Sequence, residues 1–267
     1  MAAEVVVAIK ADSRLLELCK VTMQFGGVTA MSEVDLAVDE GEIAGLIGPN
    51  GAGKTTVFNV ITGVFRPTAG EILFRANSIV GLKRYQVTRA GIARTFQNIR
   101  LFPDMTALEN VMVGADAHHR TSVPSAMLRL PRHLSEERHG RAEAMDLLEL
   151  VGIAHRVEDS ARNLPYGDQR RLEIARALAT KPKLLLLDEP AAGFNPAEKR
   201  HLSDLIRRIR DAGYTVLLIE HDMGVVMNLC DRVSVLDFGR KIAEGQPAAI
   251  QADQRVINAY LGVTADA

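Results

Sequence analysis

A glycine-rich stretch early in the chain constrains its fold more than any other feature. The apolar run 43–47 before it is typical of a buried strand, and the run 55–61 after it is typical of a helix. The stretch fits the spacing G-x-x-x-x-G-K-S/T at every fixed position, and its residues are Gly48, Pro49, Asn50, Gly51, Ala52, Gly53, Lys54, Thr55 and Thr56. Backbone N–H groups and a helix N-terminus together form a cradle for a polyphosphate. The stretch therefore predicts a phosphate loop that binds a nucleoside triphosphate such as ATP.

Two segments supply candidate ligands for Mg²⁺ and a candidate base. In the loop, Lys54 is expected to reach the β- and γ-phosphates, and the Thr55 hydroxyl is expected to ligate the metal. Far along the chain, the leucine run 184–187 is apolar at every position, as a central parallel strand must be. Because ligands bind at the carboxyl ends of such strands, Asp188 is expected to hold Mg²⁺. Glu189 would then take a proton from an attacking water.

Strand and helix signals alternate along much of the chain, which predicts an α/β fold with a P-loop NTPase core and a parallel sheet. Period-two alternation at Val34, Leu36 and Val38 adds an N-terminal antiparallel β layer. Between about residues 98 and 163 only helical signals occur, including a capping box at 106–109 and Ser135 as a cap for a second helix. We therefore expect an inserted helical sub-domain. One domain would cover 14–262, with its core in 14–97 and 164–262, a leader at 1–13 and a tail at 263–267.

Composition narrows the setting in which the chain acts. The 267 residues are 47% hydrophobic and carry a formal net charge of −1, which argues against a nucleic-acid groove. No apolar run approaches the roughly 20 residues that a membrane-spanning helix needs. Cys19 and Cys230 lie far apart without metal-type spacing, which favours the reducing cytosol.

Several segments in a fixed order make the chain resemble the nucleotide-binding subunits of ABC transporters, from about residue 15 to 262. The core is therefore expected to be of the ABC type. The segments that carry the resemblance are Phe25, the phosphate loop, Gln97, the signature 164–169, Asp188 with Glu189, the D-loop 192–195 and His221.

This resemblance implies roles for residues outside the phosphate loop. Gln97 and His221 would join Glu189 as catalytic residues, with His221 as the switch histidine. Gln97 would also join Thr55 and Asp188 as a ligand of Mg²⁺.

The resemblance also implies two further contacts with the nucleotide. Phe25 would stack on adenine, although the sequence alone also allows a core aromatic at this position. In the signature, the segment of Tyr166, Gly167 and Asp168 would bind ATP held on a partner subunit, with the Asp168 side chain facing away from the phosphates. The general signature is L-S-G-G-Q, and Pro165 replaces its serine, so a hydroxyl and an N–H are lost. Alternatively, Pro165 serves as the first residue of the signature helix.

Five segments of the sequence are similar to the corresponding segments of the branched-chain amino acid uptake ATPases. They are 25–27, 94–98, 166–176, 220–223 and 244–262. This likeness implies a second ATP-binding subunit in a homo- or heterodimer, integral membrane permease subunits and, indirectly, a periplasmic or extracellular solute-binding protein. Nucleic acid is not an expected partner. The chain would be cytoplasmic and peripheral on the inner face of the cell membrane.

Three alternatives remain beside an amino-acid importer. The first is an ABC ATPase coupled to another solute, because the solute does not touch this subunit. The second is a soluble mechanical ABC ATPase, but 98–163 holds prolines and no sustained heptads of the DNA-repair type. The third is a small-molecule kinase, which has no use for a signature segment. The sequence leaves open the solute, the permease chains, the kind of dimer and the effect of Pro165 on basal turnover.

Overall fold

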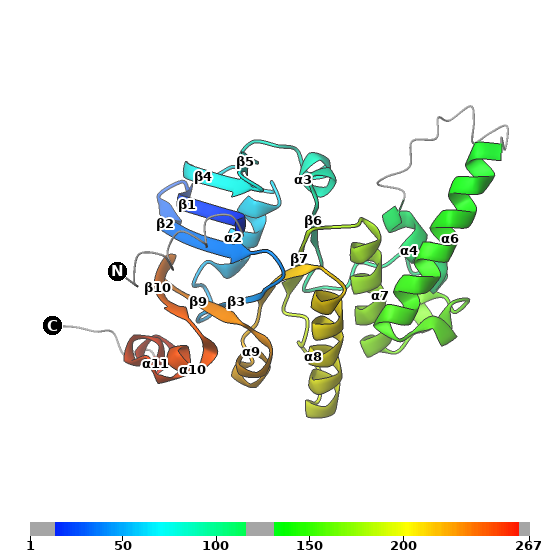
Figure 1. The fold of residues 1–267 in the computed structure, drawn as a ribbon. Helices are drawn as coiled ribbons and strands as arrows, with labels where there is room; N and C mark the ends of the chain where they lie inside the picture. The colour runs from blue at the N-terminus through cyan, green and yellow to red at the C-terminus, as the bar shows by residue number, and fades with distance from the viewer. Residues whose placement is uncertain (1–13, 116–130, 262–267) are drawn as a thin grey trace, which may run out of the picture.

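The computed structural model describes residues 14–115 and 131–261, with the backbone alone for 131–137. Two sheets lie on one side of the molecule, and a block of helices coloured green lies on the other (Figure 1). The expected leader and tail lie outside the described residues.

The smaller sheet is an antiparallel layer of four strands in the order β2-β1-β4-β5. Gly26 turns the chain between the first two strands with a φ of 56°. The strands are β1 (Arg14–Phe25), β2 (Val28–Asp39), β4 (Ala69–Phe74) and β5 (Asn77–Ser78). The predicted antiparallel β layer is thus confirmed, and its first two strands are longer than the alternating pattern alone suggests.

The larger sheet has six strands in the order β10-β9-β3-β8-β7-β6. Neighbours from β9 to β6 run parallel, whereas β10 pairs with β9 in antiparallel fashion. Its strands are β3 (Ile43–Ile47), β6 (Ile92–Arg94), β7 (Leu184–Asp188), β8 (Thr215–Ile219), β9 (Arg232–Asp237) and β10 (Arg240–Gly245). The α/β fold with a parallel sheet is confirmed.

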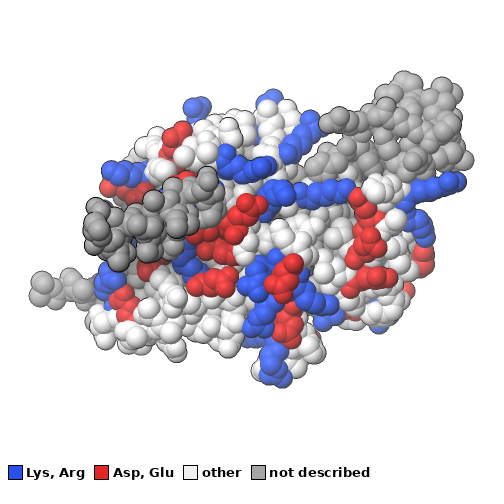
Figure 2. Space-filling model, viewed as in Figure 1, with Lys and Arg blue, Asp and Glu red and all other residues white. Residues whose placement is uncertain are grey.

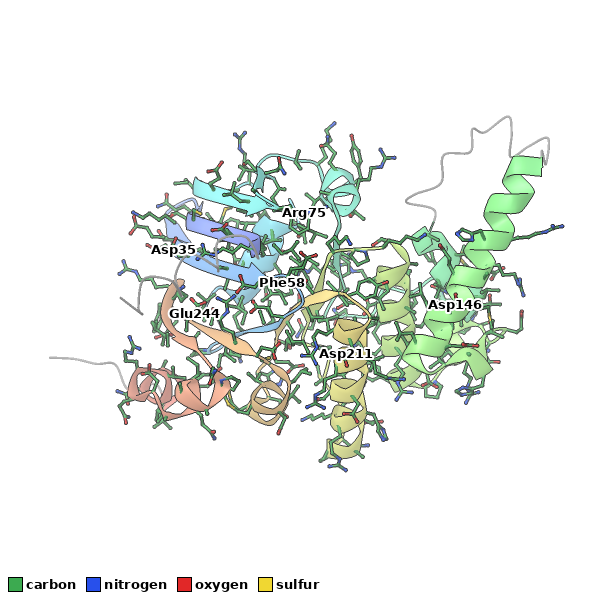
Figure 3. The ribbon with its side chains drawn as sticks, viewed as in Figure 1. Asp35, Phe58, Arg75, Asp146, Asp211 and Glu244 are labelled. Atoms are coloured by element: carbon green, nitrogen blue, oxygen red, sulfur yellow. The ribbon has the colours of Figure 1, made fainter. Side chains whose placement is uncertain are left out.

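The larger sheet buries both of its faces, so its strands separate two hydrophobic cores. In β3, Ile43 and Ile47 point into one core, and Ala44 and Leu46 point into the other. The second core also takes in the antiparallel layer and Phe58 of α2 (Lys54–Ile61), which is fully buried between the two sheets (Figure 3). Two covered faces explain why β3, β7 and β8 are apolar at nearly every position.

The first core is filled by helices on the other face of the sheet. The remaining helices of the α/β part are α3 (Arg84–Ala90), α7 (Tyr166–Ala179), α8 (Pro196–Asp211), α9 (Met223–Leu229), α10 (Pro247–Ala252) and α11 (Gln254–Leu261). Asn195 caps α8, Pro196 is its first residue and Glu198 completes a capping box.

The green block consists of α4 (Ala107–Ala115), α6 (Pro131–Val151) and two 3₁₀ turns at Ala154–Arg156 and Ala161–Asn163. It packs against α7, and the approach is close because a Cβ on Gly114 would lie 2.3 Å from the Arg176 carbonyl oxygen. The expectation that Ser135 caps the second helix is wrong. That helix begins at Pro131, whose fixed φ suits a first turn, and Ser135 lies inside it.

Two further properties of the described residues are the hydropathy of their helices and the distribution of their surface charge. Among them, no helix is both long and apolar enough to cross a membrane. Lysines and arginines lie interspersed with acidic residues over the face that Figure 2 shows.

Candidate active site

The phosphate loop joins β3 to α2, and its shape depends on glycine. Gly48 and Gly53 have φ angles of 149° and 100°. A Cβ on Gly48 would lie 2.1 Å from the Leu236 carbonyl oxygen, and one on Gly53 would lie 2.8 Å from the Ala30 carbonyl oxygen. Any larger residue would therefore clash with backbone at both positions.

The other loop residues differ in how far they face solvent. Asn50, Gly51 and Thr55 are exposed, whereas Ala52 is buried. The half-buried residues are Pro49, Gly53 and Thr56. The Thr55 hydroxyl thus lies where an incoming ligand could reach it.

Lys54 is buried against its own loop. Its ammonium donates to the carbonyl oxygens of Gly48 at 2.7 Å and Pro49 at 2.9 Å. Burial lowers the pKa of Lys54, and the nearby carboxylates of Glu189 and Asp188 oppose this shift. A phosphate entering the loop would have to compete with these two carbonyls for the ammonium group.

Asp188 ends β7, and Glu189 follows it with a φ of 47°, which is the left-handed region. Such a conformation costs a non-glycine residue about 1–3 kcal/mol and is common at functional sites. The Glu189 N–H donates to the Ile219 carbonyl oxygen at 3.0 Å, which ties the turn to β8. The two adjacent carboxylates therefore leave the sheet at its carboxyl edge in a fixed geometry.

Three predicted catalytic residues come together although they lie far apart in the sequence. The Gln97 amide Nε2 donates to Glu189 Oε2 at 2.8 Å. His221 Nδ1 lies 3.8 Å from the same oxygen, and the His221 side chain is largely exposed. The Glu189 carboxylate is thus oriented by an amide and a neighbouring imidazole, as a general base would need to be.

Arg94 takes part in the site, a contact that sequence reasoning missed. Its guanidinium pairs with the Asp188 carboxylate at 2.8 Å and donates to Asn59 Oδ1 at 2.8 Å. The side chains of Arg94 and Asp188 are only 8% and 6% exposed. In the sequence, Arg94 is a charged residue within a short predicted strand. No local pattern indicates that it pairs with Asp188.

The donor set at this edge fits Mg²⁺. The Thr55 hydroxyl, the Asp188 carboxylate and the Gln97 amide oxygen are the hard oxygen ligands that this metal prefers. No cluster of three or more His, Cys, Asp or Glu side chains suited to a metal occurs among the described residues. Nucleotide oxygens would have to complete the coordination, and Asp188 would be shared between the metal and Arg94.

Phe25 lies at the end of β1 and remains 40% exposed. Its ring meets Phe65 edge-on, with 5.0 Å between the ring centroids. The core-aromatic alternative for Phe25 is therefore wrong, because the ring is supported from one side and open to solvent. Stacking on adenine stays a prediction.

At the start of α7, the alternative that Pro165 is the first residue of the signature helix is wrong. Pro165 is the N-cap residue and not the first helical residue, and its carbonyl oxygen accepts from the N–H groups of Asp168 and Gln169, both at 2.9 Å. Gly167 is half-buried in the first turn. The Asp168 carboxylate lies 3.7 Å from Arg171 and 4.0 Å from Arg156, so two cations of the same chain offset its charge.

A fully buried arginine connects the signature helix α7 with residues 96–97, which are called the Gln97 segment. The Arg170 guanidinium donates to the carbonyl oxygens of Phe96 at 2.7 Å and Gln97 at 2.8 Å. It also donates to Glu173 Oε2 at 2.9 Å and to the Tyr166 hydroxyl at 3.1 Å. Sequence reasoning missed this network, because Arg170 and Glu173 stand among several other charged residues on the same helix.

The same helix reaches the D-loop. Tyr166 donates its hydroxyl to the Ala192 carbonyl oxygen at 3.3 Å. The Asn195 side chain is engaged in capping α8, since it accepts from the N–H groups of Ala197 at 2.9 Å and Glu198 at 3.0 Å. The signature, the D-loop and the Gln97 segment thus form one connected surface beside the carboxylates.

A profile of the ABC transporter family matches residues 31–192, which include the phosphate loop, the signature and both carboxylates. The chain is an ABC transporter ATP-binding cassette. As a member of this family, it is an ATP-hydrolysing subunit. A second profile, of the branched-chain amino acid ATP-binding cassette transporters, matches residues 240–266 of the cassette.

The cassette is similar to curated proteins over nearly its whole length. It is 45% identical to the high-affinity branched-chain amino acid transport ATP-binding protein BraF of Pseudomonas aeruginosa and to LivG of Escherichia coli, which carries the same description. Each match covers 93% of this chain and 98% of the relative. The lipopolysaccharide export system ATP-binding protein LptB of Escherichia coli is 36% identical, over 89% of this chain and 93% of that protein.

Solved structures show the same architecture. An ABC transporter ATP-binding cassette in its ADP conformation superposes with a TM-score of 0.82 at 30% identity, and the match covers 93% of this chain and 99% of that one. A dimeric bacterial ABC transporter cassette superposes with a TM-score of 0.74 at 26% identity, over 87% and 99% of the two chains.

Proposed function

We propose that this cassette is the energy-coupling subunit of an importer for branched-chain or related amino acids. The observation that carries the proposal is the match of the C-terminal segment 240–266 to the branched-chain amino acid cassettes. The 45% identity to BraF and LivG along nearly the full chain supports the same substrate class. The relationship to LptB, which is named for export, shows why the fold of a cassette alone does not define the solute.

The nucleotide is ATP, and its phosphates bind in the loop 48–56. Thr55, Asp188 and Gln97 would hold Mg²⁺ there, and the metal would supply positive charge that offsets the negative charge of the phosphates. Glu189 accepts a proton from the attacking water, because its carboxylate stands beside the loop and is oriented by Gln97 at 2.8 Å. His221, 3.8 Å from that carboxylate, completes the set on the exposed side.

The working unit is a dimer, since the chain carries one phosphate loop and one signature. In this proposal each ATP lies between the loop of one subunit and Tyr166, Gly167 and Asp168 of the other. A dimeric relative of similar fold supports this assembly. Permease subunits in the membrane and a solute-binding protein complete the transporter, so the cassette works at the cytoplasmic face of the membrane.

Co-purification tests the partners. Affinity purification of the tagged cassette from native membranes should recover integral membrane proteins together with a second cassette. Recovery of ribosomal or DNA-repair proteins in their place would favour a soluble mechanical ATPase.

Reconstitution tests the solute. The purified assembly is placed in liposomes with ATP on the cassette side, and uptake of labelled leucine, isoleucine and valine is followed with the solute-binding protein added. We expect ATP-dependent uptake and a rise in ATPase activity with leucine, and neither with the Glu189→Gln cassette. ATP hydrolysis that responds to none of these amino acids would leave the ATPase assignment intact and reject the substrate class.

A further inference from the structure

The last helix of the described chain contacts the first residue of the phosphate loop. The Gly48 N–H donates to the Tyr260 hydroxyl oxygen at 2.9 Å across 212 positions of sequence. Tyr260 lies in α11, which is anchored by the buried side chain of Val256 and packs against β10. This contact brings the segment that the branched-chain profile matches directly to the nucleotide site.

The C-terminal part of the chain holds the loop at a second point as well. The Gly239 N–H, in the turn between β9 and β10, donates to the Ala52 carbonyl oxygen at 3.1 Å. Gly48 itself is buried, and a Cβ there would meet the end of β9 at Leu236. The stretch from β9 to α11 therefore contacts the loop at both ends.

Tyr260 binds the N–H group of Gly48 and Lys54 binds its carbonyl oxygen, and a bound nucleotide would affect these two hydrogen bonds differently. Lys54 holds the Gly48 carbonyl oxygen at 2.7 Å, and phosphate oxygens would compete for that ammonium group. Tyr260 holds the N–H of Gly48, which precedes the amides of the loop that face a phosphate. The contact with Tyr260 can therefore persist when the contact with Lys54 is exchanged. The Tyr260 side chain is 39% exposed, so the contact lies at the edge of the loop; partial burial raises the pKa of its hydroxyl, and the hydrogen bond from Gly48 opposes that shift.

We propose that Tyr260 is a positioning residue for nucleotide binding, which fixes the first amide of the phosphate loop from α11. Without the hydroxyl, the empty loop can turn the Gly48 N–H toward water. A nucleotide would then have to bury that amide again, and the cost would appear as weaker binding. Because linkage is reciprocal, bound nucleotide must in turn stabilise the docked position of α11. Tyr260 would act on nucleotide binding whichever solute the transporter carries.

The Tyr260→Phe variant tests the proposal because it removes one oxygen and keeps the ring. We expect the Kd for ADP and for a non-hydrolysable ATP analogue, measured by calorimetry, to rise about fivefold to tenfold. The two ligands should be affected equally, because Gly48 lies outside the γ-phosphate site. In ATPase assays KM should rise while kcat changes less than about twofold, as loss of uniform binding requires.

Tyr85→Phe is the matched control, since it removes the hydroxyl of an exposed tyrosine in α3 and should leave both Kd values unchanged. An unchanged Kd in Tyr260→Phe together with a lower melting temperature would reduce the tyrosine to a packing residue and overturn the proposal. A tighter Kd would also overturn it, because the hydroxyl would then be restraining the loop in an unsuitable shape.

Hydrogen exchange of the unmodified chain gives a test that needs no variant. ADP should slow amide exchange in the peptide 254–261, although no atom of α11 is expected to touch the nucleotide. This protection should disappear in Tyr260→Phe and persist in Tyr85→Phe. Equal exchange in 254–261 with and without ADP would refute the coupling even if the variant failed to fold.

Discussion

At the scale of single residues, Glu189 shows how the fold prepares a carboxylate for chemistry. Its left-handed φ of 47° is maintained by a hydrogen bond to β8, and its side chain is held by Gln97. An adjacent proline, Pro190, further limits the freedom of the turn. The backbone conformation and the side-chain contacts thus fix the position of the Glu189 carboxylate.

Changing Glu189 to Gln should abolish turnover while sparing binding. The amide keeps the size of the side chain and loses the base, so ATP hydrolysis should fall about a hundredfold or more. ATP should still bind, and an ATP-bound dimer should accumulate, visible by size-exclusion chromatography with ATP and Mg²⁺. Glu198→Gln, an exchange at the start of α8 away from the carboxylate edge, is the control. Near-normal hydrolysis in Glu189→Gln would reject Glu189 as the base.

Changing Phe25 to Ala should weaken ATP binding. The ring is exposed and braced by Phe65, which suits a stacking platform, and base stacking on an aromatic ring is worth about 1–3 kcal/mol. The Kd for ATP should therefore rise about fivefold to a hundredfold, while the melting temperature changes little. Val28→Ala, a more exposed apolar residue at the start of β2, is a suitable control. Unchanged affinity would show that Phe25 serves another purpose.

At the scale of elements, the buried Arg170–Glu173 pair fixes α7 against the Gln97 segment. Burial raises the pKa of Glu173, and Arg170 counteracts that shift. Two further N–H groups, from Phe96 and Arg100, approach the Glu173 carboxylate at 3.4 Å and 3.3 Å. The signature helix and the segment that contains Gln97 therefore move as one unit unless this pair is broken.

Arg170→Ala should cost about 3–5 kcal/mol of stability at pH 8, because a buried carboxylate loses its partner. The pKa of Glu173 should then rise further. A carboxylate whose folded pKa is raised loses stability as pH increases through that pKa, so the cost should shrink toward pH 5. Urea unfolding at the two pH values measures this difference. Arg171→Ala, at a partly exposed position, should cost less than about 1 kcal/mol at either pH. An equal loss for Arg170→Ala at both pH values would contradict the account.

The sequence predicted most elements because their signals are local. The leucine run of β7, the glycine spacing of the loop and the capping box at 106–109 each depend on neighbours in the chain. Short helices such as α3 and α9 gave no sustained periodicity and were missed, as was α10.

The contacts of Arg94, Arg170 and Tyr260 could not be predicted in the same way. Each joins segments between 73 and 212 positions apart, and a local pattern does not report which side chains the topology brings together. The residues that a motif names could thus be proposed as site residues from the sequence, whereas the residues that contact and position them required the fold.

At the scale of the whole molecule, the signature serves a partner subunit in the proposed dimer, and Pro165 limits the hydrogen bonds that it can offer there. As an N-cap residue, Pro165 supplies neither a hydroxyl nor an N–H. A hydrogen bond to a charged group contributes about 1.5–3 kcal/mol. The isolated cassette should therefore dimerise weakly on ATP, and tight closure should depend on the membrane subunits.

Pro165→Ser restores both groups at the position where serine is a favoured cap, so stability should not fall. We expect stronger ATP-dependent dimerisation and faster basal turnover of the free cassette, together with looser coupling in the assembled transporter. Basal ATPase rates measured against protein concentration, for the parent and the variant, provide the test. A serine variant that is no faster and no better dimerised would show that Gly167 and the helix suffice.

The ion pair between Arg94 and Asp188 also affects how quickly nucleotide arrives. Around the loop, two cations, Lys54 and Arg94, face two anions, Asp188 and Glu189. These four charges sum to zero, so we expect them neither to draw a highly negative nucleotide strongly toward the site nor to repel it. Long-range steering, which depends steeply on ionic strength, contributes little in such a case. The pace of capture then follows the amount of free nucleotide in solution, and the site can refill at a similar rate whether the surrounding salt is high or low.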